Sequence, residues 1–195
     1  MAASKTSIVR ALTQAQVALG KLIAAPGTLD SIEAAGGLLV DVLRSGRKIM
    51  ICGNGGSMCD AAHFAEELTG RYRLDRRPLA AIACTEPGHI TCTANDYGFE
   101  HIFSRWVEAL GREGDCLVIL STSGNSPNCI RAIDAARKTN MPTIALLGKT
   151  GGEIREMVNH AIVVPGESSD RVQELHMLIL HAWVEVLEIN LFGKS

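Results

Sequence analysis

The stretch that most constrains the fold covers residues 48–60, where an apolar segment passes through a glycine-rich turn into a helical pattern. Residues 49–52 form a continuous apolar run, typical of a strand buried on both faces of a parallel sheet. The turn offers backbone amides and small polar groups, from Gly53, Asn54, Gly55, Gly56 and Ser57. It can cradle a phosphate-sugar ligand, but glycines also end strands for steric reasons, and the spacing is not the dinucleotide fingerprint G-x-G-x-x-G. Both interpretations stay open on this stretch alone.

Four further apolar runs set the fold class. They cover residues 79–84, 116–120, 143–147 and 161–164, and helical patterns lie between most of them. Because parallel neighbours need crossover helices, this alternation predicts a doubly wound α/β domain. Sheets of this kind bind ligands outside the carboxyl ends of their strands, so we expect the chemistry in the loops that follow the runs.

Helical patterns also flank the predicted sheet. Apolar positions recur every three or four residues over 5–24 and 29–43, with a break at Pro26-Gly27. Residues 168–191 form one long helical pattern, with more apolar surface than a solvent-facing helix needs, so it packs on the sheet or on another subunit. We expect residues 1–195 to form one domain, with the helical segment at about 1–45 packed on the α/β core.

Composition and charge exclude several classes of function. The chain is 47% hydrophobic and 21% charged, with a net charge of -2, which gives no general field for capturing nucleic acid or an anionic membrane. There is no signal-peptide pattern and no continuous apolar run of membrane-spanning length, so we expect a cytoplasmic protein.

The six scattered cysteines form no Cys-x-x-Cys pair and are expected to be free thiols, mostly buried. A basic cluster is interpreted as a solvated loop, at Arg71, Arg73, Arg76 and Arg77.

The run at 116–120 opens into a hydroxyl-rich turn. Ser126 is well placed as the N-cap of a helix whose first residue is Pro127. Hydroxyls, backbone N–H groups and a helix N-terminus together can bind a phosphate monoester without a lysine. Capping alone would explain Ser126 but not the three hydroxyls before it, at Ser121, Thr122 and Ser123.

Titratable side chains gather on two helical patterns. His63 and Glu67 lie four residues apart and share a face, with Asp60 one turn earlier, so they can bind a metal or transfer protons. The last helical pattern adds further candidates, at Gln173, Glu174, His176, His181 and Glu185. Spacing alone pairs His181 with Glu185 or Glu174 and leaves Gln173 two turns away, so an ion shared by Gln173 and His181 must lie between them.

A polar segment lies between the second and third predicted strands. Asn95 and Asp96 are expected in a loop there, where Asp96 can accept hydrogen bonds from sugar hydroxyls. An Asx-turn that closes a helix is an equally good interpretation of the same residues.

Five ordered motifs together resemble the phosphoheptose isomerases of the sugar-isomerase (SIS) domain superfamily. They are CGNGGSMCDAAHFAEELTGRY, ANDYGFEHIFSRWVEALGREGD, STSGNSPN, TGGE and DRVQELHMLILHAWVEVLE. The resemblance covers nearly everything after residue 40. It implies a three-layer α/β fold with a five-stranded parallel sheet flanked by helices, and a homotetramer with active sites at subunit interfaces. It also implies conversion of sedoheptulose 7-phosphate to D-glycero-D-manno-heptose 7-phosphate through an enediol, the first step toward ADP-heptose for lipopolysaccharide core.

The resemblance also assigns roles to residues of this chain. Glu67 and His181 match the acid/base pair. Ligands for one zinc ion per subunit match His63, Glu67, Gln173 and His181. Contacts to the phosphorylated heptose match Asn54, Gly55, Gly56, Ser57, Glu67, Asn95, Asp96, Ser121, Thr122, Ser123, Ser126 and Gln173. The chain departs from the usual pattern at Met58-Cys59 and at residues 85–87, which affects the shape of the pocket rather than its chemistry.

Two alternative functions remain at this point. One is that of the non-catalytic tetrameric paralogues that bind the replication initiator. Those proteins lack the acid/base carboxylate and the histidine of the last helix, and this chain keeps both Glu67 and His181. The other is isomerisation of a different phosphosugar, such as arabinose 5-phosphate, which rests on fold analogy alone.

Overall fold

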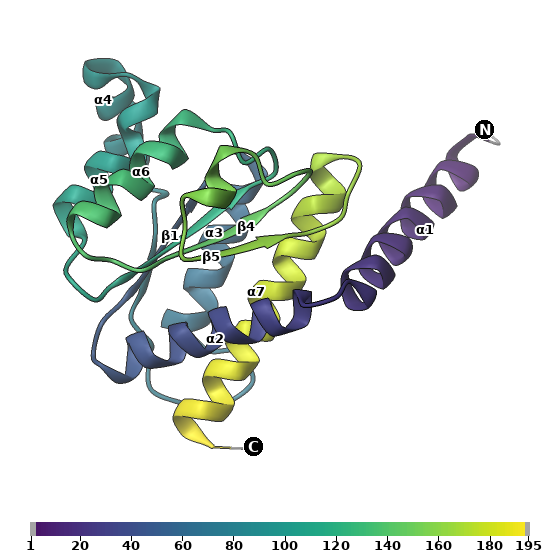
Figure 1. The fold of residues 1–195 in the computed structure, drawn as a ribbon, viewed down its shortest axis with the longest axis horizontal. Coiled ribbons are helices and arrows are strands. Elements are labelled where there is room, and N and C mark those ends of the chain that lie inside the picture. Colours follow the sequence, from purple (N-terminus) through teal and green to yellow (C-terminus); the bar gives the residue numbers. More distant parts are fainter. Residues whose placement is uncertain (1–2, 194–195) are drawn as a thin grey trace.

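Five short strands form one parallel sheet in the computed structural model, which describes residues 3–193 (Figure 1). The strands are β1 (Ile49–Gly53), β2 (Ala81–Ala83), β3 (Cys116–Ser121), β4 (Thr143–Leu147) and β5 (His160–Val163). They lie in the order β2-β1-β3-β4-β5, and each neighbouring pair is parallel. The prediction of a doubly wound α/β sheet is confirmed.

Helices flank the sheet and include the long helix predicted at the end of the chain. They are α1 (Ala3–Ala24), α2 (Thr28–Arg44), α3 (Gly56–Thr69), α4 (Pro87–Tyr97), α5 (Ile102–Leu110), α6 (Pro127–Lys138) and α7 (Ser169–Phe192), with 3-10 turns η1 (Phe99–His101) and η2 (Glu153–Glu156). By length and composition α7 could cross a membrane, but it packs against α2 and α3, with residues such as Trp183 and Leu187 fully buried. We therefore interpret α7 as a core helix.

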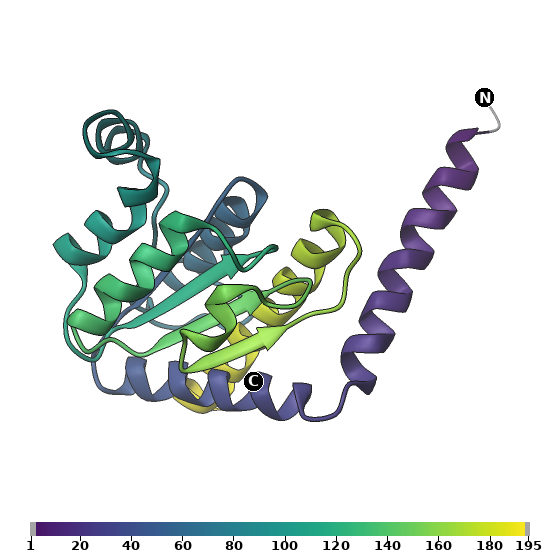
Figure 2. The ribbon, with the colours of Figure 1, turned by 45° about the horizontal axis from the view of Figure 1, so that its top comes forward.

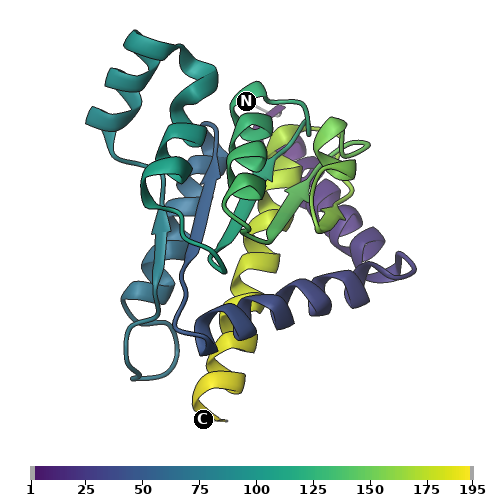
Figure 3. The ribbon, with the colours of Figure 1, turned by 60° about the vertical axis from the view of Figure 1, so that its left-hand side comes forward.

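Two apolar layers hold the helices on the sheet because side chains alternate along each strand. In β1, Ile49 and Ile51 join the core beneath α2, α3 and α7, whereas Met50 and Cys52 join the core beneath α5 and α6. Figure 3 shows the helices that cover the two sides of the sheet. All residues of β1, β3 and β4 are buried, which explains their nearly uninterrupted apolar sequence.

Helix α1 leaves this body and points away from it, as Figure 2 shows. Ala18 and Leu22 are buried near its C-terminal end, but several large apolar side chains are at least half exposed, at Ile8, Val9, Leu12, Val17 and Ile23. Such an apolar face exceeds what a solvent-facing helix needs.

The centre of the sheet contains the point where the winding direction reverses. From β1 the chain passes to β2 on one side, and β3 lies on the other side of β1. Loops that follow the two strands flanking such a point diverge and leave a crevice at the carboxyl edge of the sheet. The glycine-rich turn and the hydroxyl-rich turn are these two loops.

Candidate functional site

A polar hollow of about 240 Å³ lies at this crevice. Its lining comes from the loops after β1 and β3 and from the start of α7, with residues Asn54, Ser57, Leu120, Ser121, Thr122, Ser126, Ser169 and Gln173. Helices α3, α6 and α7 all begin here, with caps at Gly55, Ser126 and Ser168. The unpaired N–H groups and the positive dipole ends of helix N-termini favour an anion. The hollow therefore suits a phosphate group.

Two close contacts connect the loops around the hollow. The side-chain amides of Asn54 and Asn128 donate to each other's oxygens, at 3.0 and 2.8 Å, and so join the turn after β1 to the start of α6. Across the hollow, a Cβ at Gly56 would lie only 2.7 Å from the side-chain amide of Gln173. Glycine at this position thus lets α7 approach the first turn of α3.

The four predicted hydroxyls play different parts. The Ser121 hydroxyl accepts a hydrogen bond from the backbone N–H of Gly124 at 3.1 Å, and that of Ser123 accepts from the N–H of Asn125 at 3.2 Å. Thr122 Oγ1 lies 3.3 Å from Ser169 Oγ. Ser126 is the N-cap residue as predicted, but its hydroxyl makes no capping bond, so it is free to face a ligand in the hollow.

Replacing Ser126 with alanine should weaken binding of a phosphate monoester by about tenfold, the usual size of one hydrogen bond to a charged group. Stability should change little because the hydroxyl caps no backbone N–H. Calorimetric titration with a sugar phosphate measures the first effect and urea unfolding the second. Ser31→Ala, remote on α2, is the control, and an unchanged Kd for Ser126→Ala would argue against a phosphate at this position.

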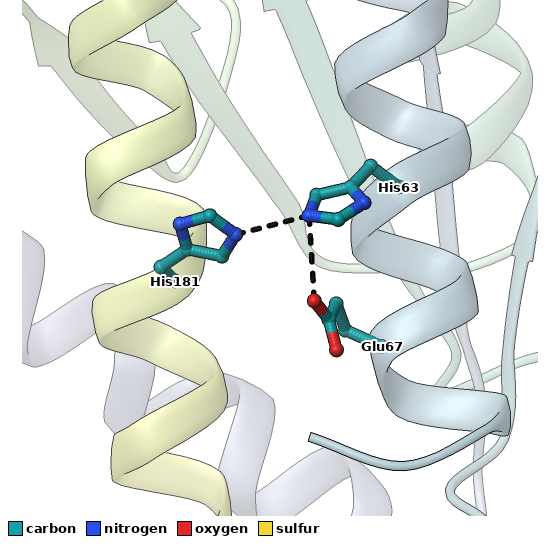
Figure 4. A group of neighbouring side chains, drawn as sticks. All are labelled: His63, Glu67 and His181. Atoms are coloured by element: carbon teal, nitrogen blue, oxygen red, sulfur yellow. Dashed lines mark hydrogen bonds and ion pairs between the residues drawn. The ribbon is translucent and has the colours of Figure 1, made fainter. Parts of the chain in front are cut away.

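Between α3 and α7 lies a second polar group, formed by His63, Glu67 and His181, which we call the His–Glu–His cluster (Figure 4). Nε2 of His63 is 3.1 Å from Nε2 of His181 and 3.3 Å from Oε1 of Glu67. One ligand atom from each residue lies within 4.8 Å of the others, a separation that one metal ion can bridge. Figure 4 shows the two helices contributing from opposite sides.

The partners that spacing suggested for His181 are engaged elsewhere. Oε1 of Glu185 pairs with Arg73 at 2.8 Å, and Oε1 of Glu174 pairs with Arg171 at the same distance. His181 instead faces His63 on the neighbouring helix. The predicted pairing by spacing is therefore wrong, because the packing of α3 against α7 decides the neighbours of His181.

Gln173 lies at the hollow, on the same helix as His181. Its Nε2 is 3.4 Å from Ser57 Oγ, and it precedes His181 by eight residues of α7, a rise of about 12 Å. Gln173 therefore lines the hollow from the same helix that carries His181 of the His–Glu–His cluster.

Burial shifts two titratable groups near these residues. It raises the pKa of Asp60, one turn before His63 on α3, to about 6, and the charge of His63 opposes this shift. It lowers the pKa of His176, which is fully buried on α7, to about 4, with the backbone of Leu147 acting in the other direction. Asp60 thus takes up a proton at a higher pH than an ordinary aspartate, whereas His176 is neutral near pH 7.

Asn95 and Asp96 lie in the last turn of α4, not in a loop as predicted. The helix forms because Glu86 caps it and Pro87 occupies its first turn, and Gly98 ends it. Asn95 Nδ2 donates to Asp96 Oδ1 at 2.7 Å, both residues are exposed, and neither lines the hollow. Figure 1 shows α4 projecting from the body of the molecule.

Leu120 and Ser169 line the hollow but were not selected from the sequence, and neither was Asn128, which lies beside it. Asn128 is locked to Asn54, and Ser169 faces Thr122 from the first turn of α7. The signal for Asn128 was its place in STSGNSPN, two residues after the N-cap of α6. Ser169 follows Ser168, the N-cap residue of α7. Only the packing of α7 brings Ser169 to the hollow, so no signal in the sequence pointed to it.

Comparisons with known proteins agree on one family. The model of the SIS domain matches residues 17–148. Phosphoheptose isomerase of Fusobacterium nucleatum is 53% identical over 157 residues, covering 80% of this chain and 81% of its own length. That of Vibrio cholerae is 47% identical, covering 91% of this chain and 93% of its own length. The solved structure of phosphoheptose isomerase from Neisseria gonorrhoeae superposes with a TM-score of 0.87 at 38% identity, covering 94% of this chain and 98% of that chain.

Proposed function

The chain belongs to the phosphoheptose isomerases of the SIS domain family, and on this premise we propose that its site converts sedoheptulose 7-phosphate to D-glycero-D-manno-heptose 7-phosphate. The protein is an aldose-ketose isomerase. Assignment as an initiator-binding paralogue is not favoured, because the chain keeps both Glu67 and His181.

The juxtaposition of the hollow and the His–Glu–His cluster carries this proposal. On α3, Ser57 at the hollow precedes His63 of the cluster by six residues, a rise of about 9 Å. An open-chain heptose 7-phosphate carries its phosphate at one end and its reacting carbons, C1 and C2, at the other. With its phosphate in the hollow, the substrate can extend along α3 and α7, so that C1 and C2 lie near the cluster.

Glu67 and His181 are the acid/base pair in this mechanism. A base removes a proton from C1 of the ketose while an acid protonates O2, which gives an enediol. The proton then returns to C2, and O1 loses its own proton to become the aldehyde oxygen. The largely buried carboxylate of Glu67 and the imidazole of His181 stand on opposite helices, so one group can exchange protons at carbon while the other serves the oxygens.

The same residues suit a zinc ion, which we assign as the cofactor, one per subunit. Two imidazole nitrogens and one carboxylate oxygen form a donor set typical of zinc, and the side chains of His63, Glu67 and His181 already converge. Gln173 supplies the fourth ligand in this proposal. When bound, zinc polarises the carbonyl and stabilises the charge that develops on the substrate oxygens.

We further propose a homotetramer in which a second copy completes the site. Asn95 and Asp96, which are assigned to the substrate by resemblance, are exposed on the projecting helix α4, where they are available to a neighbouring subunit. The exposed apolar face of α1 supplies contact surface for the same assembly. Free cysteines throughout the described residues fit a cytoplasmic location, where the product would enter the route to ADP-heptose and lipopolysaccharide core.

The deciding experiment is turnover of sedoheptulose 7-phosphate by purified protein, followed by NMR of the product, with chelator and with added zinc. We expect a manno-heptose 7-phosphate, activity lost on chelation and restored by zinc, and a particle mass four times that of the 20.8 kDa chain. Arabinose 5-phosphate is the control substrate. Turnover of the control alone would overturn the substrate assignment, and full activity after chelation would overturn the role of zinc.

A further inference from the structure

The loop that follows α3 is tied to α7, although its run of arginines suggested a solvated segment. We call residues 70–79 the arginine strap; Figure 3 shows it as the rounded loop near the C-terminal end of α3. Arg71 and Arg77 are exposed, as expected for a solvated loop. The same expectation is wrong for Arg76, whose side chain is only 2% exposed.

Arg76 joins the end of α3 to α7. Its Nε donates to Oε1 of Glu188 on α7 at 3.1 Å. Its two terminal nitrogens donate to the backbone oxygens of Glu67 and Leu68, each at 2.8 Å. These carbonyls belong to the last turn of α3, where helices lack internal donors, so the guanidinium caps the helix. Glu188 is 4% exposed and also accepts from the backbone N–H of Leu74.

This connection joins the two halves of the His–Glu–His cluster. One of the capped carbonyls belongs to Glu67 itself, and Glu188 lies seven residues, or about two turns, beyond His181 on α7. A buried ion pair is often no more stabilising than well-packed apolar side chains. Stability alone therefore does not explain a buried arginine at position 76. A role in fixing the separation of α3 and α7 does explain it.

A second contact reaches the cluster from the same strap. The ring of Tyr72 stacks on the imidazole of His181, with 5.9 Å between centroids and 22° between planes. The guanidinium of Arg73 lies 5.2 Å from the centroid of the Tyr72 ring and pairs with Glu185, one turn beyond His181. Tyr72 is thus held between an arginine and the imidazole, and it limits the orientations open to His181.

We infer that the arginine strap is a positioning device for catalysis: Arg76 fixes the spacing of α3 and α7, and Tyr72 fixes the ring of His181. The inference rests on the proposed function, since it concerns the same cluster. Neither Arg76 nor Tyr72 lines the hollow, so both act through other residues.

Tyr72 gives the first test, because it is only half-buried and its replacement should not prevent folding. Tyr72→Ala should lower kcat about tenfold with KM nearly unchanged, whereas Tyr72→Phe keeps the ring and should match the wild type. Arg71→Gln, exposed on the same strap, is the control. Unchanged kcat in Tyr72→Ala, or an equal loss in Tyr72→Phe, would overturn stacking as the positioning contact.

Arg76 gives the second test, through a double variant that separates positioning from stability. Arg76→Met with Glu188→Leu replaces the ion pair by apolar side chains, so the protein should stay folded, with an unfolding midpoint lowered only by the lost hydrogen bonds to Glu67, Leu68 and Leu74. The capping of Glu67 and Leu68 is lost, so kcat should fall by about a hundredfold with KM little changed. Wild-type kcat in a folded double variant would overturn the inference. An inactive wild-type protein would instead overturn the proposed function and the inference together.

Discussion

Glu67→Gln is expected to lower kcat by about a thousandfold or more while leaving the fold intact. The amide has the shape of the carboxylate but cannot accept the proton in the enediol step, and it is a weaker ligand for a metal. Glu67 contacts His63 within the His–Glu–His cluster, and its side chain is largely buried, so water cannot easily take over its role. The same loss is expected for His181→Ala on the opposite helix. Turnover of the heptose phosphate and thermal unfolding measure the two claims.

The neighbouring Glu66 provides a matched control on the same helix. It also approaches His63, with Oε2 at 3.5 Å from Nδ1, but its side chain is mostly exposed and lies outside the cluster. Glu66→Gln should therefore keep nearly wild-type kcat. Equal losses in the Glu66 and Glu67 variants, or wild-type turnover in Glu67→Gln, would contradict the assignment of Glu67 as the acid/base group.

Gly124→Ala is expected to be the most damaging single-methyl substitution in the site. Gly124 has a φ of +68°, and an added Cβ would lie 1.9 Å from the backbone oxygen of Gly151 in the loop after β4. Because neither backbone can yield cheaply, we expect a loss of about 3 kcal/mol or more in the free energy of unfolding. The hydroxyl-rich turn after β3, in which the N–H of Gly124 donates to the hydroxyl of Ser121, would also shift. We therefore expect KM for the phosphorylated substrate to rise. Urea denaturation and steady-state kinetics measure both effects.

Gly37→Ala is the matched substitution for this experiment. Gly37 lies in the interior of α2, and an added Cβ would meet nothing within 4 Å. Alanine is favoured over glycine inside a helix, so the variant should be as stable as the wild type or more stable by up to about 1 kcal/mol. If the Gly124→Ala and Gly37→Ala proteins unfolded at the same urea concentration, the loops after β3 and β4 would have to adapt freely to the added methyl group.

The sequence allowed the sheet and the place of the polar hollow to be predicted because their signals are local. A buried parallel strand such as β4 is apolar throughout, and the run at 143–147 matches its bounds. The second predicted strand was too long, since only Ala81–Ala83 pairs with β1. The two polar turns could be placed together because strands that run in parallel end at the same edge of the sheet.

Contacts between α3 and α7 could not be predicted from periodicity. Spacing reports which residues share a face of one helix, but it does not report which helix packs against that face. His181 therefore seemed to need Glu174 or Glu185, whereas its neighbours are His63 and the ring of Tyr72. The burial of Arg76 was missed for the same reason, because its partners are the far end of α7 and two helix carbonyls.

The lining of the hollow has a further consequence for how ligand affinity depends on pH. Its side chains are hydroxyls, amides and one aliphatic group, and none of them gains or loses a proton in the physiological range. A phosphate monoester, by contrast, passes from one negative charge to two near pH 6. The side chains that line the hollow therefore contribute no proton of their own to binding, and the change in affinity that they experience near pH 6 comes from the second ionisation of the phosphate.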